Sequence, residues 1–298
     1  MSDLQGSTAQ RGSLVLLLIR GGIGGVLMGL ANLVPGISGG TMLLASGVYT
    51  RFIQAVAEVT TLRFRGRSIV LLLVVVLSAL AAIVLLAGPV KHLVETRRWI
   101  MYSVFIGLTL GGVPLVWRRA RPANGAVLLG TAAGFACMAA LAFTGAPGGA
   151  REGVALLVVA GIAGASAMVL PGVSGAYLLL VLGQYETILG AVRDLDFSVL
   201  LPVGIGVAIG IAGVSNLVRW ALERHGKATL GVLLGLLLGS VLGIWPFQEA
   251  VERGAPRAYF APGLLQVLAA AGLVLAGLAA TRAIDRIGSP AGAADSSR

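Results

Sequence analysis

Two short segments of the chain carry the same pattern, Pro-Gly-x-Ser-Gly, at Pro35 to Gly39 and Pro171 to Gly175, and each interrupts a long apolar stretch. Proline lacks a backbone donor and disfavours helical geometry in the preceding residue, while glycine lets the chain reverse. Both segments are therefore predicted to break a helix. The helix after each break starts with unpaired N–H groups, and its dipole adds roughly half a positive charge there.

Such helix starts bind anions, and phosphate above all. Ser38 and Ser174 can each cap the following helix or donate a hydroxyl to the anion, and Thr41 adds a second hydroxyl in the first segment. The pattern thus predicts one anion site built from both breaks. Its candidate phosphate-binding residues are Pro35, Gly36, Ser38, Gly39, Gly40, Thr41, Pro171, Gly172, Ser174 and Gly175.

The composition identifies the elements around these breaks as membrane helices. Of 298 residues, 57% are hydrophobic and 11% are charged, whereas a soluble domain has roughly 45–50% apolar and 25% charged residues. The net charge of +10 comes from short basic clusters between apolar segments, so no nucleic-acid partner is expected. The single cysteine, Cys137, excludes an intrachain disulfide framework and is expected to be buried.

The apolar blocks predict an all-α polytopic membrane protein with two helical hairpins. The blocks fall at residues 13–34, 41–57, 68–90, 99–117, 125–144, 153–170, 176–192, 199–220, 229–247 and 263–284. After the first break, the uninterrupted run Met42 to Val48 is about 10 Å long as a helix, too short to cross a bilayer. We therefore favour re-entrant hairpins, with two full crossings in each hairpin as the alternative.

The basic residues orient this topology. With two returning hairpins and six single spans, 15 of the 22 Lys and Arg residues fall on the side of the two termini. Because cytoplasmic loops carry the excess of Lys and Arg, both termini are predicted to be cytoplasmic, in a bacterial inner membrane. Residues 1–298 then form a single membrane domain, in which 288–298 are a flexible tail.

The two halves of the chain are internally similar. Residues 34–50 and 170–186 are identical at 8 of 17 positions, and residues 107–117 and 235–245 at 6 of 11. Three single spans separate the hairpins, so residues 11–144 and 153–287 are predicted to be inverted repeats, as in secondary transporters with broken helices. Glycine stripes at 21, 25 and 29 and at 231, 235, 239 and 243 are expected to let neighbouring helices approach closely.

The predicted anion site requires a compensating positive charge. A helix end contributes at most about 2 kcal/mol, and a bare charge at mid-membrane costs at least roughly 2.5–3.5 kcal/mol. Arg20, in the same block as Asn32, is the first candidate for this charge, and Arg51 is the second, although either can instead extend to the interface. Glu186 is a candidate carrier of a coupling proton, with a plain interfacial position as its alternative.

Catalysis is not expected from these residues. The chain contains only two histidines, His92 and His225, and no paired acidic motif lies next to either hairpin. A lipid phosphatase would need a better-placed base or nucleophile. We therefore predict a non-enzyme without a cofactor or a metal, and the pattern defines neither an oligomeric state nor a coupling ion.

The chain resembles the bacterial polyprenyl-phosphate transporters, a family long catalogued as a domain of unknown function. The resemblance covers residues 20 to 285 in order and is carried by Pro35-Gly36-Ile37-Ser38-Gly39-Gly40-Thr41, Gly47-Val48-Tyr49, Gly107 to Pro114, Leu170-Pro171-Gly172-Val173-Ser174-Gly175, Gly183-Gln184-Tyr185-Glu186 and Gly235 to Pro246.

The resemblance implies a flippase for undecaprenyl phosphate that recycles this lipid carrier for peptidoglycan synthesis, with both breaks as the head-group site. The chain departs from the family pattern at Thr50, where many relatives have Glu, and at Ala176, where many have Ser. Two alternatives remain: a secondary transporter of a small soluble anion, which needs an enclosed polar cavity, and a structural membrane protein. A lipid carrier requires instead an apolar groove beside the breaks.

Overall fold

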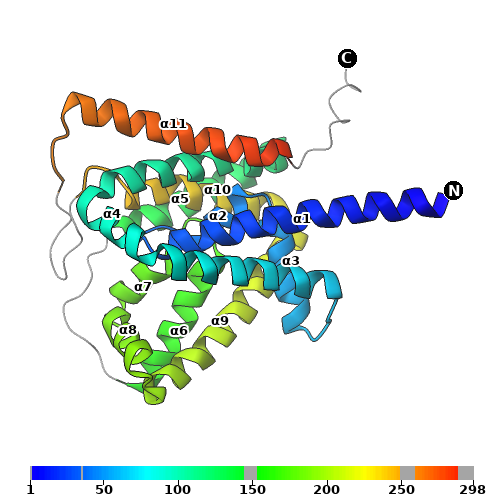
Figure 1. The fold of residues 1–298 in the computed structure, drawn as a ribbon, viewed down its shortest axis with the longest axis horizontal. Coiled ribbons are helices and arrows are strands. Elements are labelled where there is room, and N and C mark those ends of the chain that lie inside the picture. The colour runs from blue at the N-terminus through cyan, green and yellow to red at the C-terminus, as the bar shows by residue number, and fades with distance from the viewer. Residues whose placement is uncertain (1, 35, 144–152, 249–258, 288–298) are drawn as a thin grey trace.

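The computed structural model describes residues 2–34, 36–143, 153–248 and 259–287, and this part of the chain folds into eleven helices (Figure 1). Pro35 and the predicted tail, 288–298, lie outside the described residues. The helices are α1 Ser2–Asn32, α2 Gly39–Ala45, α3 Tyr49–Thr60, α4 Gly66–Ala120, α5 Gly125–Phe143, α6 Val154–Val169, α7 Gly175–Val181, α8 Tyr185–Asp194, α9 Phe197–Arg224, α10 Gly226–Gly243 and α11 Leu264–Ile287.

Seven described helical stretches are long and apolar enough to cross a membrane, and they confirm the all-α polytopic fold. They are Leu14–Asn32, Gly66–Val90, Arg98–Ala120, Gly125–Phe143, Phe197–Arg224, Gly226–Gly243 and Leu264–Arg286. The six predicted single spans are among them, and the seventh is the first arm of the first predicted hairpin. Large apolar side chains such as Leu77, Leu129 and Leu265 are exposed on these helices, as expected for surfaces that face lipid.

α1 runs along the first part of α4, and α6 runs along α9. Both pairs meet at glycines: a Cβ atom on Gly25 would collide with the carbonyl oxygen of Val75, and one on Gly161 with that of Val203. Only a residue without a side chain lets two helix backbones approach so closely. The glycine stripe predicted on α1 is therefore confirmed as a packing surface.

α11 runs along the second part of α4, and α10 runs along α5. These two contacts also correspond, because a Cβ atom on Gly107 would meet the Val274 carbonyl and one on Gly235 would meet the Thr131 carbonyl. Gly107 and Gly235 are equivalent positions of the two halves. The stripe predicted on α10 faces α5 except at Gly243, whose Cβ position has no neighbour.

Each predicted hairpin contains a second break that the sequence analysis did not separate from its apolar block. Block 41–57 is divided between α2 and α3 at Gly47, which has a φ of +76°, and block 176–192 between α7 and α8 at Gly183, which has a φ of +70°. Both helices end in the same way, with Val48 N–H bonded to Leu43 O at 3.1 Å in the first hairpin. α7 and the first part of α8 are bent by 115°.

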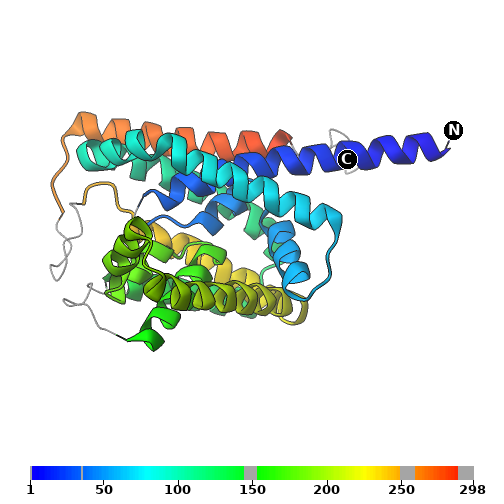
Figure 2. The same ribbon diagram turned by 60° about the horizontal axis from the view of Figure 1, so that its bottom comes forward.

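The last helices of the two hairpins, α3 and α8, lie toward opposite ends of the helix bundle. α3 lies near the end where α1 begins, and α8 lies near the other end, in both views (Figures 1 and 2). This arrangement is the one that inverted repeats require, and the orientation of the hairpins in a bilayer stays a prediction.

The two spans predicted at residues 68–90 and 99–117 both belong to α4, which kinks at Arg97, a residue with non-helical geometry. One local expectation was wrong. Cys137 was expected to be buried and is exposed on α5. An apolar environment can be provided by lipid as well as by the protein core, so hydrophobicity alone did not decide which way this side chain points.

Candidate functional site

The first break lies between α1 and α2, and Ser38 starts the second of these helices. Gly36 has a φ of +91°, a conformation that residues with a side chain rarely adopt. Ser38 is the N-cap of α2, and its Oγ accepts a hydrogen bond from the Thr41 N–H at 3.4 Å. The serine therefore caps its helix, which is one of its two predicted roles.

The second break, between α6 and α7, has the same backbone. Gly172 also has a φ of +91°, and Ser174 caps α7 by accepting a hydrogen bond from the Tyr177 N–H at 3.4 Å. Pro171, Gly172 and Ser174 are all buried. The motif thus produces the same turn twice, in two places far apart in the sequence.

The structure brings the two breaks together. The Ser38 hydroxyl donates to the Leu170 carbonyl at 3.0 Å, and the Gly172 N–H donates to Thr41 Oγ1 at 2.7 Å. The Cβ position of Gly40 lies 2.8 Å from the carbonyl oxygen of Val169, so a side chain there would separate the hairpins. Hydroxyl and amide groups that could bind an anion therefore bind the opposite hairpin in this state.

The second break lies beside the middle of α10, a helix long enough to span a membrane, and the first break lies beside the end of this helix, where Gly36 meets Ile244. A Cβ atom on Gly172 would collide with the carbonyl oxygen of Leu236 in that helix. The space between the breaks, α5 and α10 measures about 20 Å³ and is lined in part by Gly36, Ser174 and Ser240. This volume holds about one water molecule. A phosphate does not fit between the hairpins until they separate.

The four predicted supporting residues lie at different distances from the breaks. Asn32 ends α1 near Gly39, the first residue of α2. Arg20 lies farther back on α1, where its Nη2 donates to the carbonyl oxygens of Ile284, at 3.1 Å, and Asp285, at 2.8 Å.

Arg51 in α3 and Glu186 in α8 are exposed, and each lies one helix beyond its break. The structure therefore brings only Asn32 of these four residues to the breaks.

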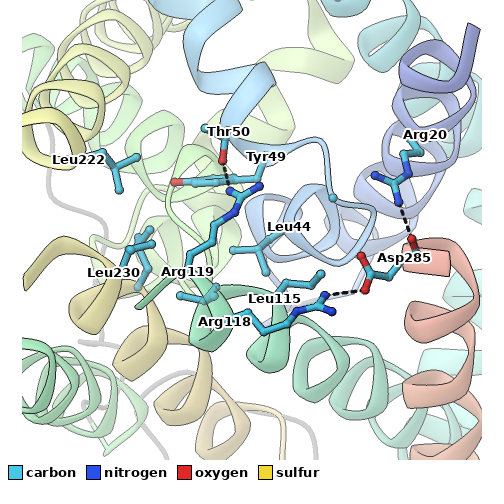
Figure 3. Close-up of a pocket in the computed structure, with 13 residues that line it drawn as sticks. Arg20, Leu44, Tyr49, Thr50, Leu115, Arg118, Arg119, Leu222, Leu230 and Asp285 are labelled. Atoms are coloured by element: carbon cyan, nitrogen blue, oxygen red, sulfur yellow. Dashed lines mark hydrogen bonds and ion pairs between the residues drawn. The ribbon is translucent and has the colours of Figure 1, made fainter. Parts of the chain in front are cut away.

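Arg20 instead lines a larger cavity at the opposite end of α2 (Figure 3). The cavity measures about 390 Å³. Its polar lining includes Tyr49 and Thr50 from the start of α3, Arg118 and Arg119 from the last turn of α4, and Asp285 from α11. The molecule therefore contains a closed seam at the breaks and an open basic cavity one short helix away.

Two contacts position the cavity's arginines. Arg118 Nη2 lies 2.6 Å from Asp285 Oδ2, and Arg119 Nη1 donates to Thr50 Oγ1 at 2.6 Å (Figure 3). Sequence reasoning placed Arg118 and Arg119 only in a basic loop and gave position 50 no role. The periodicity of the block ending at residue 117 could have extended the helix by one turn, but it could not show that this turn faces α3.

The described residues offer no metal centre, because no three His, Cys, Asp or Glu side chains among them gather at one point. Apart from the Asp285 carboxylate, which pairs with Arg118, the polar groups of the breaks and the cavity are hydroxyls, amides and guanidinium groups. These groups donate hydrogen bonds, and together they suit an anionic oxygen ligand.

Comparison with known proteins agrees with this chemistry. The chain is 30% identical over 240 residues to the polyprenyl-phosphate transporter of Vibrio cholerae serotype O1, covering 76% of this chain and 78% of the relative. It is 29% identical over 240 residues to the polyprenyl-phosphate transporter of Staphylococcus aureus, covering 74% and 84%. No solved structure matches the chain. The family model described as VCA0040-like, undecaprenyl phosphate translocase-like, matches residues 28–258. The chain therefore belongs to the undecaprenyl phosphate translocase-like family of multi-pass membrane proteins.

Proposed function

We propose that this chain is a flippase that moves undecaprenyl phosphate from the outer to the inner leaflet of a bacterial cytoplasmic membrane and so recycles the carrier for peptidoglycan synthesis. The observation that carries the proposal is the direct contact of two glycine-serine helix breaks, the second of which packs against the middle of α10. The names of the two relatives, both polyprenyl-phosphate transporters, support the substrate class. Both termini lie in the cytoplasm in this proposal.

The contact between the breaks acts as a seal that the head group must open. When the bonds from Ser38 to Leu170 and from Gly172 to Thr41 separate, a hydroxyl and an amide become available to the phosphate. The starts of α2 and α7 then add their N–H groups. The ten residues predicted from the two motifs form the proposed phosphate site, in which the prolines shape the turns, and the prenyl tail remains in the lipid.

Charge balance determines how such transport is driven. Inward movement of an anion against an inside-negative potential costs about 2.3 kcal/mol per charge per 100 mV. We propose that a proton or another cation moves with the phosphate. Glu186, at the exposed start of α8, is the proposed proton carrier at the end opposite the cavity.

The proposal is tested with purified full-length protein in liposomes that carry labelled undecaprenyl phosphate. Movement between leaflets is expected only in liposomes that contain the protein, and an imposed pH gradient or potential is expected to change its rate. Failure of a folded, correctly inserted protein to move the lipid would overturn the proposed function. Protein-dependent uptake of inorganic phosphate, without lipid movement, would favour the small-anion alternative.

Variants at the breaks identify the residues involved. The pair Ser38→Ala with Ser174→Ala, and Gly172→Leu separately, are expected to slow transport at least about 10-fold, since each removes charge-assisted contacts or blocks the turn. Gly204→Leu is the matched control, because the Cβ position of Gly204 on α9 has no neighbour within 4 Å. If the break variants transported the lipid at the wild-type rate, the breaks would have no part in the mechanism.

A further inference from the structure

The 390 Å³ cavity beyond α2 has a lining suited to an anion but no role in the function proposed above. We propose that this cavity is a second phosphate site, which holds the phosphomonoester head group of the lipid after it leaves the breaks. The inference rests on the proposed function for the identity of the lipid. The shared chemistry is a phosphate anion, which a lipid head group or free inorganic phosphate could supply.

The cavity has an excess of positive charge. Its lining contains three arginines, at 20, 118 and 119, and one carboxylate, Asp285. Among the described residues, only Arg118 of the three lies within ion-pair distance of a carboxylate. Arg119 donates to the neutral hydroxyl of Thr50, and Arg20 donates to neutral carbonyl oxygens. An incoming phosphate would supply the negative charge that these guanidinium groups lack.

The start of α3 adds donors of a different kind. Its N-cap, Val48, offers no side-chain hydrogen bond to the first turn, and the first bond within the helix runs from Phe52 N–H to Val48 O. Backbone N–H groups of the first turn are thus left for a ligand. This turn contains Tyr49 and Thr50, both of which line the cavity.

Tyr49 provides a second and independent sign of a ligand. The side chain is buried, with 5% of the residue exposed, and its hydroxyl has no hydrogen-bond partner among the described residues. A buried polar atom without a partner costs about 1–3 kcal/mol, so such atoms are rare unless a ligand or water satisfies them. The phenol lines the cavity near Arg119 (Figure 3).

The other walls of the cavity favour a lipid over a free ion. Leu222 on α9 and Leu230 and Leu233 on α10 add apolar side chains to the lining. A cavity of this size exceeds what one phosphate needs and falls in the range that encloses larger organic ligands. The first prenyl units can lie on the leucines while the phosphate meets the guanidinium groups.

The cavity and the breaks lie at opposite ends of α2. α2 starts at Gly39, beside the contact between the hairpins, and its Leu44 and the following Gly47 line the cavity. A helix of seven residues is about 10 Å long. One short, buried helix therefore separates the contact between the breaks from the basic cavity.

Binding of farnesyl phosphate to the purified full-length protein in detergent tests the site directly. Arg119→Gln is expected to weaken binding about 10-fold or more, the loss expected for one charge-assisted hydrogen bond. Thr50→Glu is expected to weaken binding as strongly, because the new carboxylate would form an ion pair with the guanidinium group of Arg119 and compete with the phosphate. Arg63→Gln is the matched control, since Arg63 is exposed in the α3–α4 connection and does not line the cavity. It is expected to bind within about twofold of wild type.

Inorganic phosphate and farnesol distinguish the possible sources of the anion. Farnesyl phosphate is expected to bind more tightly than inorganic phosphate, and farnesol is expected not to compete. Equal competition by inorganic phosphate would assign the cavity to a soluble anion and overturn the lipid assignment. Unchanged farnesyl phosphate affinity in both Arg119→Gln and Thr50→Glu would overturn the site itself.

The transport assay separates this inference from the proposed function. If Arg119→Gln moved the lipid as fast as wild type, the proposed function would be supported and the cavity would have no part in transport. Arginine-dependent binding in a protein that moves no lipid would support the cavity as an anion site and overturn the flippase.

Discussion

The two hairpins have nearly the same backbone and different surroundings. Gly36 and Gly172 share a φ of +91°, and Ser38 and Ser174 cap α2 and α7 with the same 3.4 Å bond. The side chains around the outer ends of these helices do not correspond. Arginines 20, 118 and 119 align with Leu156, Pro246 and Phe247 when the two sequence matches are extended.

This difference separates two requirements of the molecule. Breaking a helix twice and packing the breaks against each other depends on glycine, serine and proline, and both halves retain these residues. Attracting an anion depends on charge, and the three arginines of the cavity belong to the first half, while the aligned positions of the second half have none. The two breaks therefore share one turn geometry, whereas the three arginines lie together at one end of α2, the end predicted to face the cytoplasm.

The largest predicted effect distinguishes the two symmetric glycines of the breaks. Gly172→Ala is expected to destabilise the protein by about 2–5 kcal/mol, because a left-handed conformation is combined with a collision against the Leu236 backbone. Gly36→Ala is expected to cost only about 1–2 kcal/mol, since its nearest neighbour is the Ile244 side chain at 3.2 Å. Thermal unfolding in one detergent measures both variants. Equal losses would contradict the predicted asymmetry.

Equivalent helix contacts should instead respond equally. Gly107→Ala and Gly235→Ala each place a methyl group against a carbonyl oxygen of a neighbouring helix, so each is expected to cost about 3 kcal/mol. Gly204→Ala, at a position with open space, is expected to stabilise α9 by about 0.5–1 kcal/mol. The same unfolding measurement applies. A clear difference between Gly107→Ala and Gly235→Ala would show that the two helix pairs do not contribute equally to the free energy of unfolding.

A third pair of variants compares the hydroxyls at equivalent positions after the two breaks. Thr41→Val leaves the buried Gly172 N–H without its acceptor and is expected to cost about 2 kcal/mol. Tyr177→Phe removes a hydrogen bond to Leu141 O, measured at 2.9 Å, and is expected to cost about 1 kcal/mol. Hydrogen exchange at the Gly172 amide measures the first effect locally. Its protection should fall in Thr41→Val and remain in Tyr177→Phe.

The smallest predicted effect on stability concerns the cavity's ion pair. Asp285→Asn is expected to change the unfolding free energy by less than about 1 kcal/mol, because Arg118 is 62% exposed and the pair is screened by solvent. The second half has no such pair at Pro246 and still forms the corresponding helix contact. Thermal unfolding at low and high salt measures the effect. A loss above about 2 kcal/mol would make the pair structural.

The sequence predicted the breaks because their chemistry is local. Proline and glycine act on their own backbone, and a serine caps a helix by accepting a hydrogen bond from the N–H three residues later. Gly36, Ser38, Gly172 and Ser174 could therefore be assigned without a fold. The glycine stripe on α1 was predictable for a similar reason, since its period shows a close contact with another helix. The partner of that stripe was not, because many apolar helices could fill the position.

The cavity could not be predicted from the same information. Arg118 and Arg119 form one basic cluster among several. They line the cavity because α4 ends beside α3 and α11. Arg20 was singled out as a buried charge, but its neighbours were expected at the breaks and lie instead near residue 285. Contacts between residues so distant in the chain depend on how the helices pack.

The sequence by itself determined the membrane class, the repeated breaks and the net positive charge, because hydrophobicity, backbone geometry and net charge are properties of local composition. The tertiary structure alone decided that the breaks bind each other through Ser38, Thr41, Leu170 and Gly172, and that three arginines surround one cavity. Those contacts depend on the relative position of entire helices. The close approach of glycine-lined surfaces sets that position, and no short motif encodes it.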